Sequence, residues 1–140
     1  FYKWSLEHYK INLNFLNLDS VFNIMKNILV TGGTGFIGSH TCISLLESGN
    51  NITIVDSFMN SNKSVIEGIK KVLKLSNNYL GDIRNTSFLQ DVFLDSKNNK
   101  KPIDGVIHFA GLKAVGESMV NPIIYWDVNV NGSINLLKVM

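Results

Sequence analysis

NILVTGGTGFIG, residues 27–38, joins a strand-like run to a glycine-rich turn, and this stretch decides the fold. The run at 28–30 is continuously apolar, as is typical of a parallel strand covered on both faces. A helical pattern follows over 37–47, and Gly49 then supplies a left-handed stop that a residue without Cβ adopts easily. The sequence therefore predicts a strand, a tight turn and a helix in direct succession.

The three spaced glycines of this turn have separable uses. Gly32 permits the tight turn, Gly35 lets the backbone approach a pyrophosphate, and Gly38 allows the helix to pack closely on the strand. A pyrophosphate would lie at the helix N-terminus, where unpaired N–H groups and the positive end of the helix dipole favour an anion. A glycine-rich turn can also be only a turn, so the motif alone leaves both interpretations open.

A second signal comes about twenty residues later, where Asp56 ends a predicted strand over 51–56. An acidic side chain there accepts hydrogen bonds from the adenosine ribose hydroxyls of a dinucleotide and repels a 2′-phosphate. The glycine turn has no Lys or Arg to neutralise such a phosphate, so the pattern favours NAD over NADP. A nucleoside-triphosphate loop is excluded because Ser39 follows Gly38 where that loop needs Lys and then Ser or Thr.

Predicted strands and helices alternate along the rest of the chain. Two further strands are expected, a short one just before Gly81 and one over 105–110. The expected helices cover 64–73, a segment capped by Ser87 with Gln90, and a segment from Asn121-Pro122 to the end, with a loop over 95–101. This alternation predicts an α/β fold: a Rossmann-like doubly wound parallel sheet in the order 3-2-1-4, truncated after about four strands.

Composition excludes several classes of function. With 45% hydrophobic and 17% charged residues, the 140 residues are typical of a globular domain. The net charge of +2 comes without a basic block, so nothing indicates binding to nucleic acid or to an anionic membrane. Cys42 is the only cysteine, which excludes an internal disulfide, and no Cys/His cluster has the spacing of a metal site. Because the apolar runs are too short to cross a bilayer, we expect a cytoplasmic protein.

Residues 1–24 differ from the rest of the chain. They are rich in aromatic residues, Asn and Leu, and they contain neither Gly nor Pro. Met25 stands where a dinucleotide-binding domain would begin. We therefore expect 1–24 to be a leader or extension and 25–140 to be the domain, with a helix that packs on the domain as the alternative.

Three stretches together resemble a known family: LVTGGTGFIGSHT at 29–41, GDIRN at 81–85 and HFAGLKAVGES at 108–118. They are similar to the UDP-glucose 4-epimerases, a branch of the extended short-chain dehydrogenases/reductases. The glycine turn is shared by the whole extended family, whereas 111–118 is more specific to the epimerases. The resemblance covers about 25–140.

The resemblance implies a role for individual residues. Phe36 and Ile37 would meet the cofactor pyrophosphate together with the glycines. The adenosine ribose would be wrapped by Asp56, Ser57, Phe58, Met59, Asn60 and Ser61, and the adenine would be held by Asp82 and Ile83. The nicotinamide side would be bordered by Phe109, Ala110, Gly111, Leu112 and Lys113, with a further cofactor contact from Asn129. The sugar pocket would be lined by Lys113, Ala114 and Val115.

Each of these residues also has a plainer interpretation. Asp82 could be an ordinary turn residue, Lys113 a solvated loop lysine, and Asn129 a residue that only satisfies loop backbone. His108 is better read as a packed histidine than as a base. The chain also departs from the family pattern, because Val128 stands where the epimerases more often have Asn and the third strand is short.

The family's catalytic residues, a Ser and a Tyr-x-x-x-Lys pair, have no match here, because no Tyr is followed four residues later by Lys. The resemblance implies an N-terminal fragment, without catalytic residues or a metal, of a UDP-glucose 4-epimerase. That enzyme would interconvert UDP-glucose and UDP-galactose through NAD and a 4-keto sugar, as a homodimer. Two alternatives stay open: another nucleotide-sugar enzyme, such as a dehydratase or a UDP-N-acetylhexosamine 4-epimerase, and a non-catalytic NAD-binding module.

Overall fold

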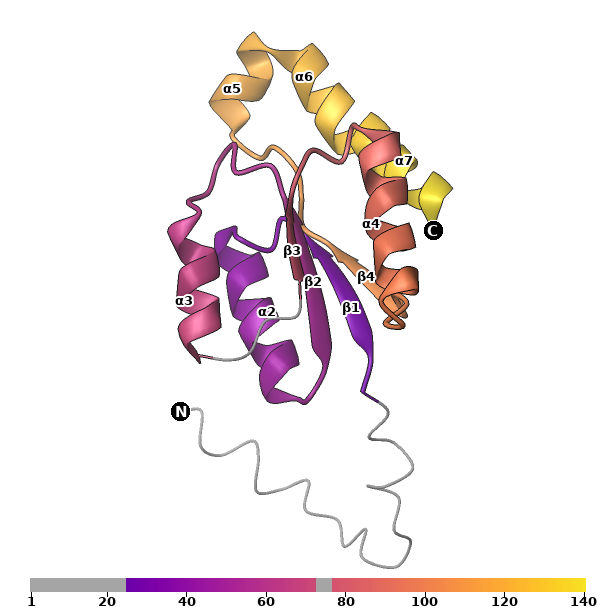
Figure 1. Cartoon of the computed structure of the whole chain (residues 1–140). Helices are drawn as coiled ribbons and strands as arrows, with labels where there is room; N and C mark the ends of the chain where they lie inside the picture. Colours follow the sequence, from indigo (N-terminus) through magenta and orange to yellow (C-terminus); the bar gives the residue numbers. More distant parts are fainter. Residues whose placement is uncertain (1–24, 73–76) are drawn as a thin grey trace, which may run out of the picture.

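The computed structural model describes residues 25–72 and 77–140, and within them a parallel four-stranded sheet lies between two pairs of helices (Figure 1). The strands are β1 (Asn27–Thr31), β2 (Asn51–Asp56), β3 (Asn77–Leu80) and β4 (Gly105–His108). The helices are α2 (Phe36–Glu47), α3 (Ser64–Val72), α4 (Thr86–Asn98), α5 (Val115–Val120), α6 (Pro122–Trp126), the π-helical η1 (Asp127–Asn131) and α7 (Gly132–Val139). The predicted fold class is confirmed.

The strand order is β3-β2-β1-β4, as expected. From β1 to β3 each strand is added on the same side of the sheet. The chain then returns through α4 and places β4 on the other side of β1. Leu29 faces both neighbours in register, opposite Thr53 of β2 and Val106 of β4. The order therefore reverses between β1 and β4, and a doubly wound sheet binds ligands in the crevice at the carboxyl ends of its strands near such a reversal.

Two apolar cores hold the layers together, because alternate residues of each buried strand point to opposite faces. Leu29 faces α4 and α7, where it packs with Val55 and Leu136. Val30, the next residue, faces α2 and α3, where it packs with Ile54 and the buried thiol of Cys42. Figure 1 shows this arrangement, with α2 and α3 on one side of the sheet and α4 and α7 on the other.

Several predicted boundaries were wrong by a few residues. The fourth strand ends at His108 rather than at 110. The expected short strand just before Gly81 is confirmed as Asn77–Leu80, although Asn is a poor strand former. Asn85, not Ser87, caps α4: its side chain accepts a hydrogen bond from the Phe88 N–H. This helix continues through most of the expected loop at 95–101, to Asn98. The short α5 was not predicted.

The predicted C-terminal helix is confirmed, and it contains an irregularity. The residues at the α6/η1 and η1/α7 junctions keep right-handed helical backbone, so the helix continues from Pro122 to Val139 through the π-helical segment. Gly132 ends this segment, where a Cβ would meet the side chain of Ile83 at 2.6 Å. The missing side chain lets the helix approach the loop after β3 closely.

In the described part of the chain, no helix is both long and apolar enough to cross a membrane. The expectations for 1–24 and for Leu73 lie outside the described residues.

Candidate functional site

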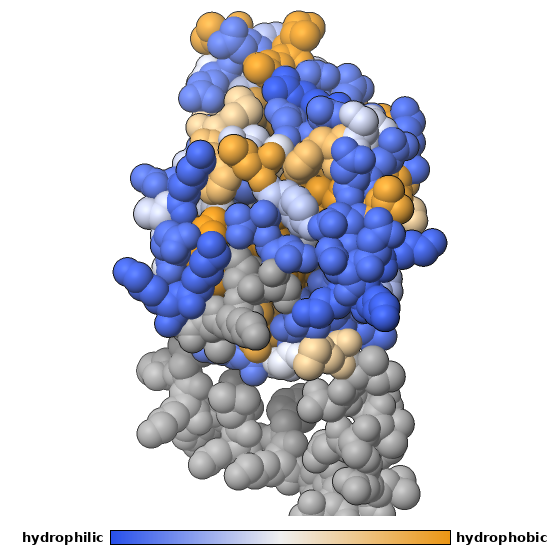
Figure 2. All heavy atoms as spheres, viewed as in Figure 1, coloured by the Kyte–Doolittle hydropathy of each residue, from blue (hydrophilic) through white to orange (hydrophobic). Residues whose placement is uncertain are grey.

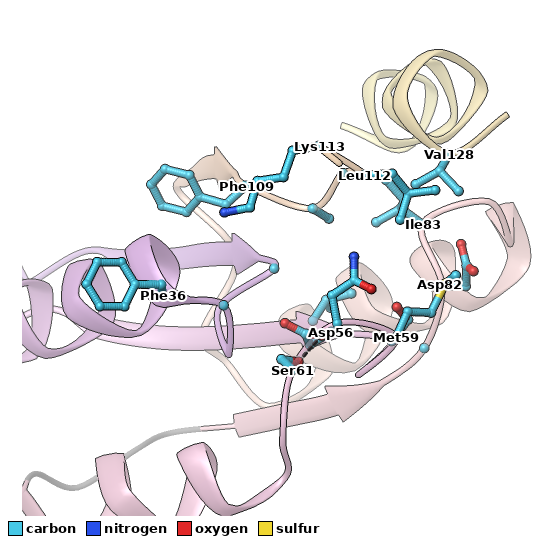
Figure 3. A pocket seen from close by; sticks show the side chains of 18 residues that line it. Phe36, Asp56, Met59, Ser61, Asp82, Ile83, Phe109, Leu112, Lys113 and Val128 are labelled. Atoms are coloured by element: carbon cyan, nitrogen blue, oxygen red, sulfur yellow. Dashed lines mark hydrogen bonds between the residues drawn. The ribbon is translucent and has the colours of Figure 1, made fainter. Parts of the chain in front are cut away.

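A pocket of about 250 Å³ lies at the carboxyl ends of the strands, where the strand order reverses. Each strand contributes the residue at or just beyond its end: Gly32 after β1, Asp56 of β2, Gly81 after β3 and Phe109 after β4. Figure 3 shows Phe109, Lys113 and Leu112 along one side of the pocket, with Asp56, Ser61 and Met59 along the opposite side. The topology thus brings together segments that are far apart in the sequence.

The glycine turn takes a shape that side chains would block. Gly32 has a φ of +67°, and a Cβ on it would stand 2.6 Å from the backbone nitrogen of Ala110. A Cβ on Gly38 would collide with the carbonyl oxygen of Gly32. Gly32 therefore provides both the tight turn and the room for the strand end beside it, and Gly38 lets the first turn of α2 press against the loop.

The N-terminus of α2 keeps its backbone donors free. Gly35 occupies the cap position and has no side chain to accept hydrogen bonds, and the first turn of α2 has no acidic residue. The Phe36, Ile37 and Gly38 amides have no acceptor among the described residues. Such free N–H groups, together with the positive end of the helix dipole, favour an anion.

Asp56 organises the floor of the pocket and is only 8% exposed. One carboxylate oxygen accepts the Thr34 N–H at 3.0 Å, which ties β2 to the glycine turn. The other accepts the Phe58 N–H at 2.8 Å and the Ser61 hydroxyl at 3.2 Å. A carboxylate offers about four acceptor positions, so three of them are occupied and one stays open for a ligand hydroxyl.

The loop after β2 is held in an unusual backbone conformation. Phe58 has a φ of +55°, in the left-handed region that bulky residues seldom adopt. Its ring packs into the core against α2 and α3, and the Lys63 ammonium lies 5.9 Å from the ring centroid. The packing of Phe58 in the core thus anchors the loop on the side away from the pocket. Its neighbours line the pocket: Ser57, Met59, Asn60 and Ser61.

The pocket rim beside β3 is fixed by an ion-pair network. Arg84 donates to both carboxylate oxygens of Asp82, at 2.7–3.1 Å, and to Asp127 of η1 at 3.1 Å. The guanidinium, through its hydrogen bonds, lowers the pKa of the Asp82 carboxyl. The side chain of Ile83 is buried against Gly132, in the core. Asp82 therefore places a fixed negative charge at the pocket rim, and the side chain of Ile83 is held in place by its packing.

The loop over 109–113 is held by Asn129 of η1. Asn129 Oδ1 accepts the Leu112 N–H at 2.7 Å, and its Nδ2 donates to the Leu112 carbonyl at 2.9 Å. Both halves of the amide are used on the loop backbone, in agreement with the plainer interpretation of this residue. Val128, next to it in the π-helical segment, lines the pocket. Lys113 also lines it and makes no hydrogen bond or ion pair with the described residues.

Most of the residues singled out from the sequence meet in this pocket. Those that line it are Gly32, Gly35, Phe36, Asp56, Ser57, Met59, Asn60, Ser61, Asp82, Ile83, Phe109, Ala110, Gly111, Leu112 and Lys113. Those that do not line it are Ile37, Gly38, Phe58, Asn129, Ala114 and Val115. Their roles toward a ligand stay predictions.

Three residues that line the pocket were not predicted to do so from the sequence: Val55, Gly81 and Val128. The hydrogen bonds of Thr34 and Arg84 were not predicted either. The spacing Asp82-x-Arg84 was a readable signal, because an Arg two residues after an Asp can pair with it locally. Thr34 gave no signal, because its tie to Asp56 depends on the pairing of β1 with β2. Gly81 gave none either, since the ring that requires it, Phe88, belongs to α4.

Tyr79 and Tyr125, the two tyrosines among the described residues, have pKa values shifted away from the range of a catalytic base. Burial, together with Asp95, raises the pKa of Tyr79 to about 12. Partial desolvation and the nearby carboxylate of Glu117 also raise the pKa of Tyr125. Both shifts are opposite to those of a phenolate base. No group of three or more His, Cys, Asp or Glu in the described ranges could hold a metal ion.

Comparisons with known proteins agree with this geometry. A family model described as GDP-mannose 4,6 dehydratase matches residues 29–140. A UDP-glucose 4-epimerase of Neisseria meningitidis serogroup A is 50% identical over 117 residues, which are 83% of this chain and 33% of that protein. A UDP-glucose 4-epimerase of Klebsiella pneumoniae is 42% identical, over 81% of this chain and 78% of that one.

Among solved structures, the UDP-glucose 4-epimerase of Bifidobacterium longum in complex with NAD+ and UDP matches with a TM-score of 0.75. It is 43% identical and covers 82% of this chain, which in turn covers 33% of it. The chain thus spans about a third of the length of most of the relatives described here.

Proposed function

Because this chain belongs to the extended short-chain dehydrogenase/reductase family, we propose that its whole protein is a UDP-glucose 4-epimerase and that residues 25–140 bind NAD. The observation that carries the proposal is the meeting of the free α2 N-terminus with Asp56 in one pocket at the strand-order reversal. A glycine turn alone could be only a turn, but here an anion site and an acceptor for hydroxyl groups lie in the same pocket.

The chain's own residues fit a dinucleotide. The pyrophosphate would meet the unpaired amides of Phe36 and Ile37, in the space that Gly32 and Gly35 leave free. A hydroxyl of the dinucleotide's adenosine ribose would donate a hydrogen bond to the open acceptor position of Asp56. The adenine would lie toward Asp82, and the nicotinamide toward the loop over 109–113.

The same arrangement favours NAD over NADP. A 2′-phosphate on the adenosine ribose would lie against the buried carboxylate of Asp56, and the repulsion would weaken binding. Lys113 is the only cation among the residues that line the described pocket, and it stands on the opposite wall, across from Asp56 (Figure 3). Nothing at the ribose end therefore compensates for the extra phosphate.

The proposed reaction interconverts UDP-glucose and UDP-galactose, in galactose metabolism, and NAD supplies it with a reversible hydride acceptor. The described residues hold and orient the cofactor: Asp56 fixes its ribose, and Asn129 fixes the loop that borders its reactive end. Lys113 adds a positive charge on that side. We propose that the base that takes a proton from the sugar is the Tyr of the family's Tyr-x-x-x-Lys pair, which has no match in this sequence.

Two experiments test the proposal. In the first, the 140-residue chain is titrated with NAD and with NADP by calorimetry, and we expect clear binding of NAD and weaker binding of NADP. Equal affinities would overturn the cofactor assignment. In the second, the coding sequence is read past Met140 for a Ser and a Tyr-x-x-x-Lys pair, and the protein it encodes is assayed with UDP-galactose. Without that motif, a non-catalytic NAD-binding module becomes the better proposal.

We also propose that the whole protein is a homodimer. Apolar side chains gather over α5 and α6 at one end of the molecule (Figure 2). Met119, Ile123 and Trp126 are largely exposed there, and Leu137 is exposed on α7. An apolar patch of this kind on a soluble domain is typical of an interface. Light scattering on the whole protein should give twice the mass of one chain, and a monomer would contradict the proposal.

A further inference from the structure

Our further inference concerns His108, the last residue of β4. Its side chain is partly open to water, and β4 is an edge strand of the described sheet, yet both ring nitrogens have protein partners. Nδ1 lies 2.5 Å from the Thr31 hydroxyl at the end of β1, and Nε2 lies 2.9 Å from the Ser133 hydroxyl of α7. The ring thus bridges two strand ends and the C-terminal helix.

The hydrogen bonds around the ring define its tautomer. Ser133 Oγ lies 2.6 Å from the carbonyl oxygen of Asn129, which can only accept, so the hydroxyl donates there. Its oxygen is then the acceptor for His108, whose Nε2 must carry the proton. Nδ1 is left as an acceptor for the Thr31 hydroxyl, and that oxygen in turn accepts the Ala110 N–H at 3.3 Å. The chain of bonds is complete only for a neutral imidazole with its proton on Nε2.

This chain of bonds begins and ends at the same wall of the pocket. It starts at the Ala110 N–H and passes through Thr31, His108 and Ser133 to the backbone of Asn129. The side chain of Asn129 then makes both of its hydrogen bonds to Leu112. Ala110 and Leu112 both line the pocket, and the two ends of the network therefore fix the loop over 109–113.

We propose that His108 is a positioning residue: as the Nε2–H imidazole it couples α7 to the strand ends and so fixes the pocket wall at Ala110 and Leu112. Its effect on the cofactor rests on the proposed function, since the same wall would border the nicotinamide. Because linked hydrogen bonds polarise one another, loss of one link weakens its neighbours. Partial burial lowers the pKa of the His108 imidazole, which keeps the ring neutral at neutral pH.

The test compares two serine variants that lose the same kind of bond. Ser133→Ala removes the hydroxyl that accepts from His108 and donates to the carbonyl four residues earlier. Ser48→Ala, the matched control, removes a hydroxyl that donates at 2.8 Å to the carbonyl of Ser44, also four residues earlier, at the far end of α2. Ser133→Thr keeps the hydroxyl and serves as the rescue variant.

Nuclear magnetic resonance gives a readout that does not need the cofactor. Imidazole nitrogen shifts of the unchanged 140-residue chain, assigned with His108→Gln, should show His108 as the Nε2–H tautomer at neutral pH. Ser133→Ala should move the Leu112 amide resonance, whereas Ser48→Ala and Ser133→Thr should leave it in place. An Nδ1–H tautomer, or a Leu112 amide unmoved by Ser133→Ala, would overturn the proposal.

Calorimetry with NAD gives the second readout. One net hydrogen bond corresponds to roughly three- to tenfold in affinity, so Ser133→Ala should weaken NAD binding by about that factor. Ser48→Ala should not change it. If the Leu112 amide moves but NAD affinity is unchanged, the positioning role toward the cofactor is wrong. If even the unchanged chain binds no NAD, the proposed function fails, while the tautomer and the Leu112 shift still decide the coupling.

Discussion

The carbonyl oxygen of Gly32 occupies the space in which a Cβ on Gly38 would stand. This contact is between two backbones, so no rotation of a side chain can relieve it. It fixes how closely the first turn of α2 approaches the glycine turn, whose Gly32 and Gly35 line the pocket together with Phe36 at the start of the helix.

Gly38→Ala should therefore destabilise the chain. Alanine is the better helix former by about 1 kcal/mol, but the overpacking against Gly32 costs about 1–3 kcal/mol and requires the turn to move. We expect a net loss of stability in urea unfolding and weaker NAD binding. Gly68→Ala is the matched control: Gly68 lies in α3 with nothing within 4 Å of an added Cβ. It should stabilise by about 0.5–1 kcal/mol. A Gly38→Ala variant as stable as Gly68→Ala would show that the contact is not limiting.

Asp56→Ala should weaken NAD binding and reduce the preference for NAD over NADP. The lost charge-assisted hydrogen bond corresponds to about 1.5–3 kcal/mol, and the repulsion of a 2′-phosphate disappears with the carboxylate. Asp91→Ala removes an exposed carboxylate from α4 and is the control for net charge. Calorimetric titrations of both variants measure the effect. An unchanged ratio of NAD to NADP affinity would rule out Asp56 as the discriminating residue.

Asp56→Ala also removes the three hydrogen bonds that organise the loop around it. A fall in the midpoint of urea unfolding is therefore expected together with the loss of affinity. Asp56→Asn keeps the shape but only one of the two acceptor oxygens, because the other is replaced by an NH2 donor. It separates the two effects: stability should recover in part, whereas discrimination against NADP should not.

The sequence predicted the strands because their signals are local, and it predicted their order because strands that alternate with helices after a glycine turn are typical of a doubly wound sheet. The apolar runs at 28–30 and 51–56 and the glycines between them can be read from neighbouring residues. Boundaries were less predictable: Asn77 and Asn78 enter β3 because they pair with Thr53 and Ile54, which is a tertiary effect that overrides strand propensity.

The pocket residues were predictable for the same reason, since they follow strand ends. Contacts that connect distant segments were not. The hydrogen bonds between Thr34 and Asp56 and between Asn129 and Leu112 depend on how the strands and the C-terminal helix come together. The π-helical segment that carries Asn129 has no sequence signal either, because its residues Asp127–Asn131 fit an ordinary helical pattern.

Arg84→Met should cost stability at neutral pH and less in acid. Arg84 lowers the pKa of Asp82, so the stabilisation is present above the ordinary value of 3.8 and is lost as the pH falls through the lowered one. Urea midpoints of the two proteins should therefore converge below about pH 4. Lys97→Met, on the last turn of α4, is the control and should give no convergence. A constant difference at all pH values would show that Arg84 acts through packing alone.

His108 is a base rather than an acid like Asp82, but it should also make the protein less stable as the pH falls. Its folded pKa lies below the ordinary 6.5, so the unfolded chain binds the proton more tightly. Stability is therefore fully present above about pH 6.5 and falls as the pH is lowered from there through the folded pKa. His108→Gln should remove this slope, whereas His40→Gln, on α2, should keep it. A slope that persists in His108→Gln would assign it to another group.

The 140-residue chain should bind NAD without epimerising UDP-galactose. A base must take the proton of the sugar hydroxyl near neutral pH, and catalytic groups need a pKa near that pH. In Tyr79 and Tyr125 the pKa is raised, and Tyr79 contacts Asp95 on α4, outside the pocket. Both ring nitrogens of His108 are already engaged, with Thr31 and with Ser133, and His108 does not line the pocket. A coupled assay for UDP-glucose, with calorimetry on the same sample, should therefore give a binding signal and no turnover. Turnover would contradict this prediction, and its loss in Tyr79→Phe, Tyr125→Phe or His108→Gln would identify the base.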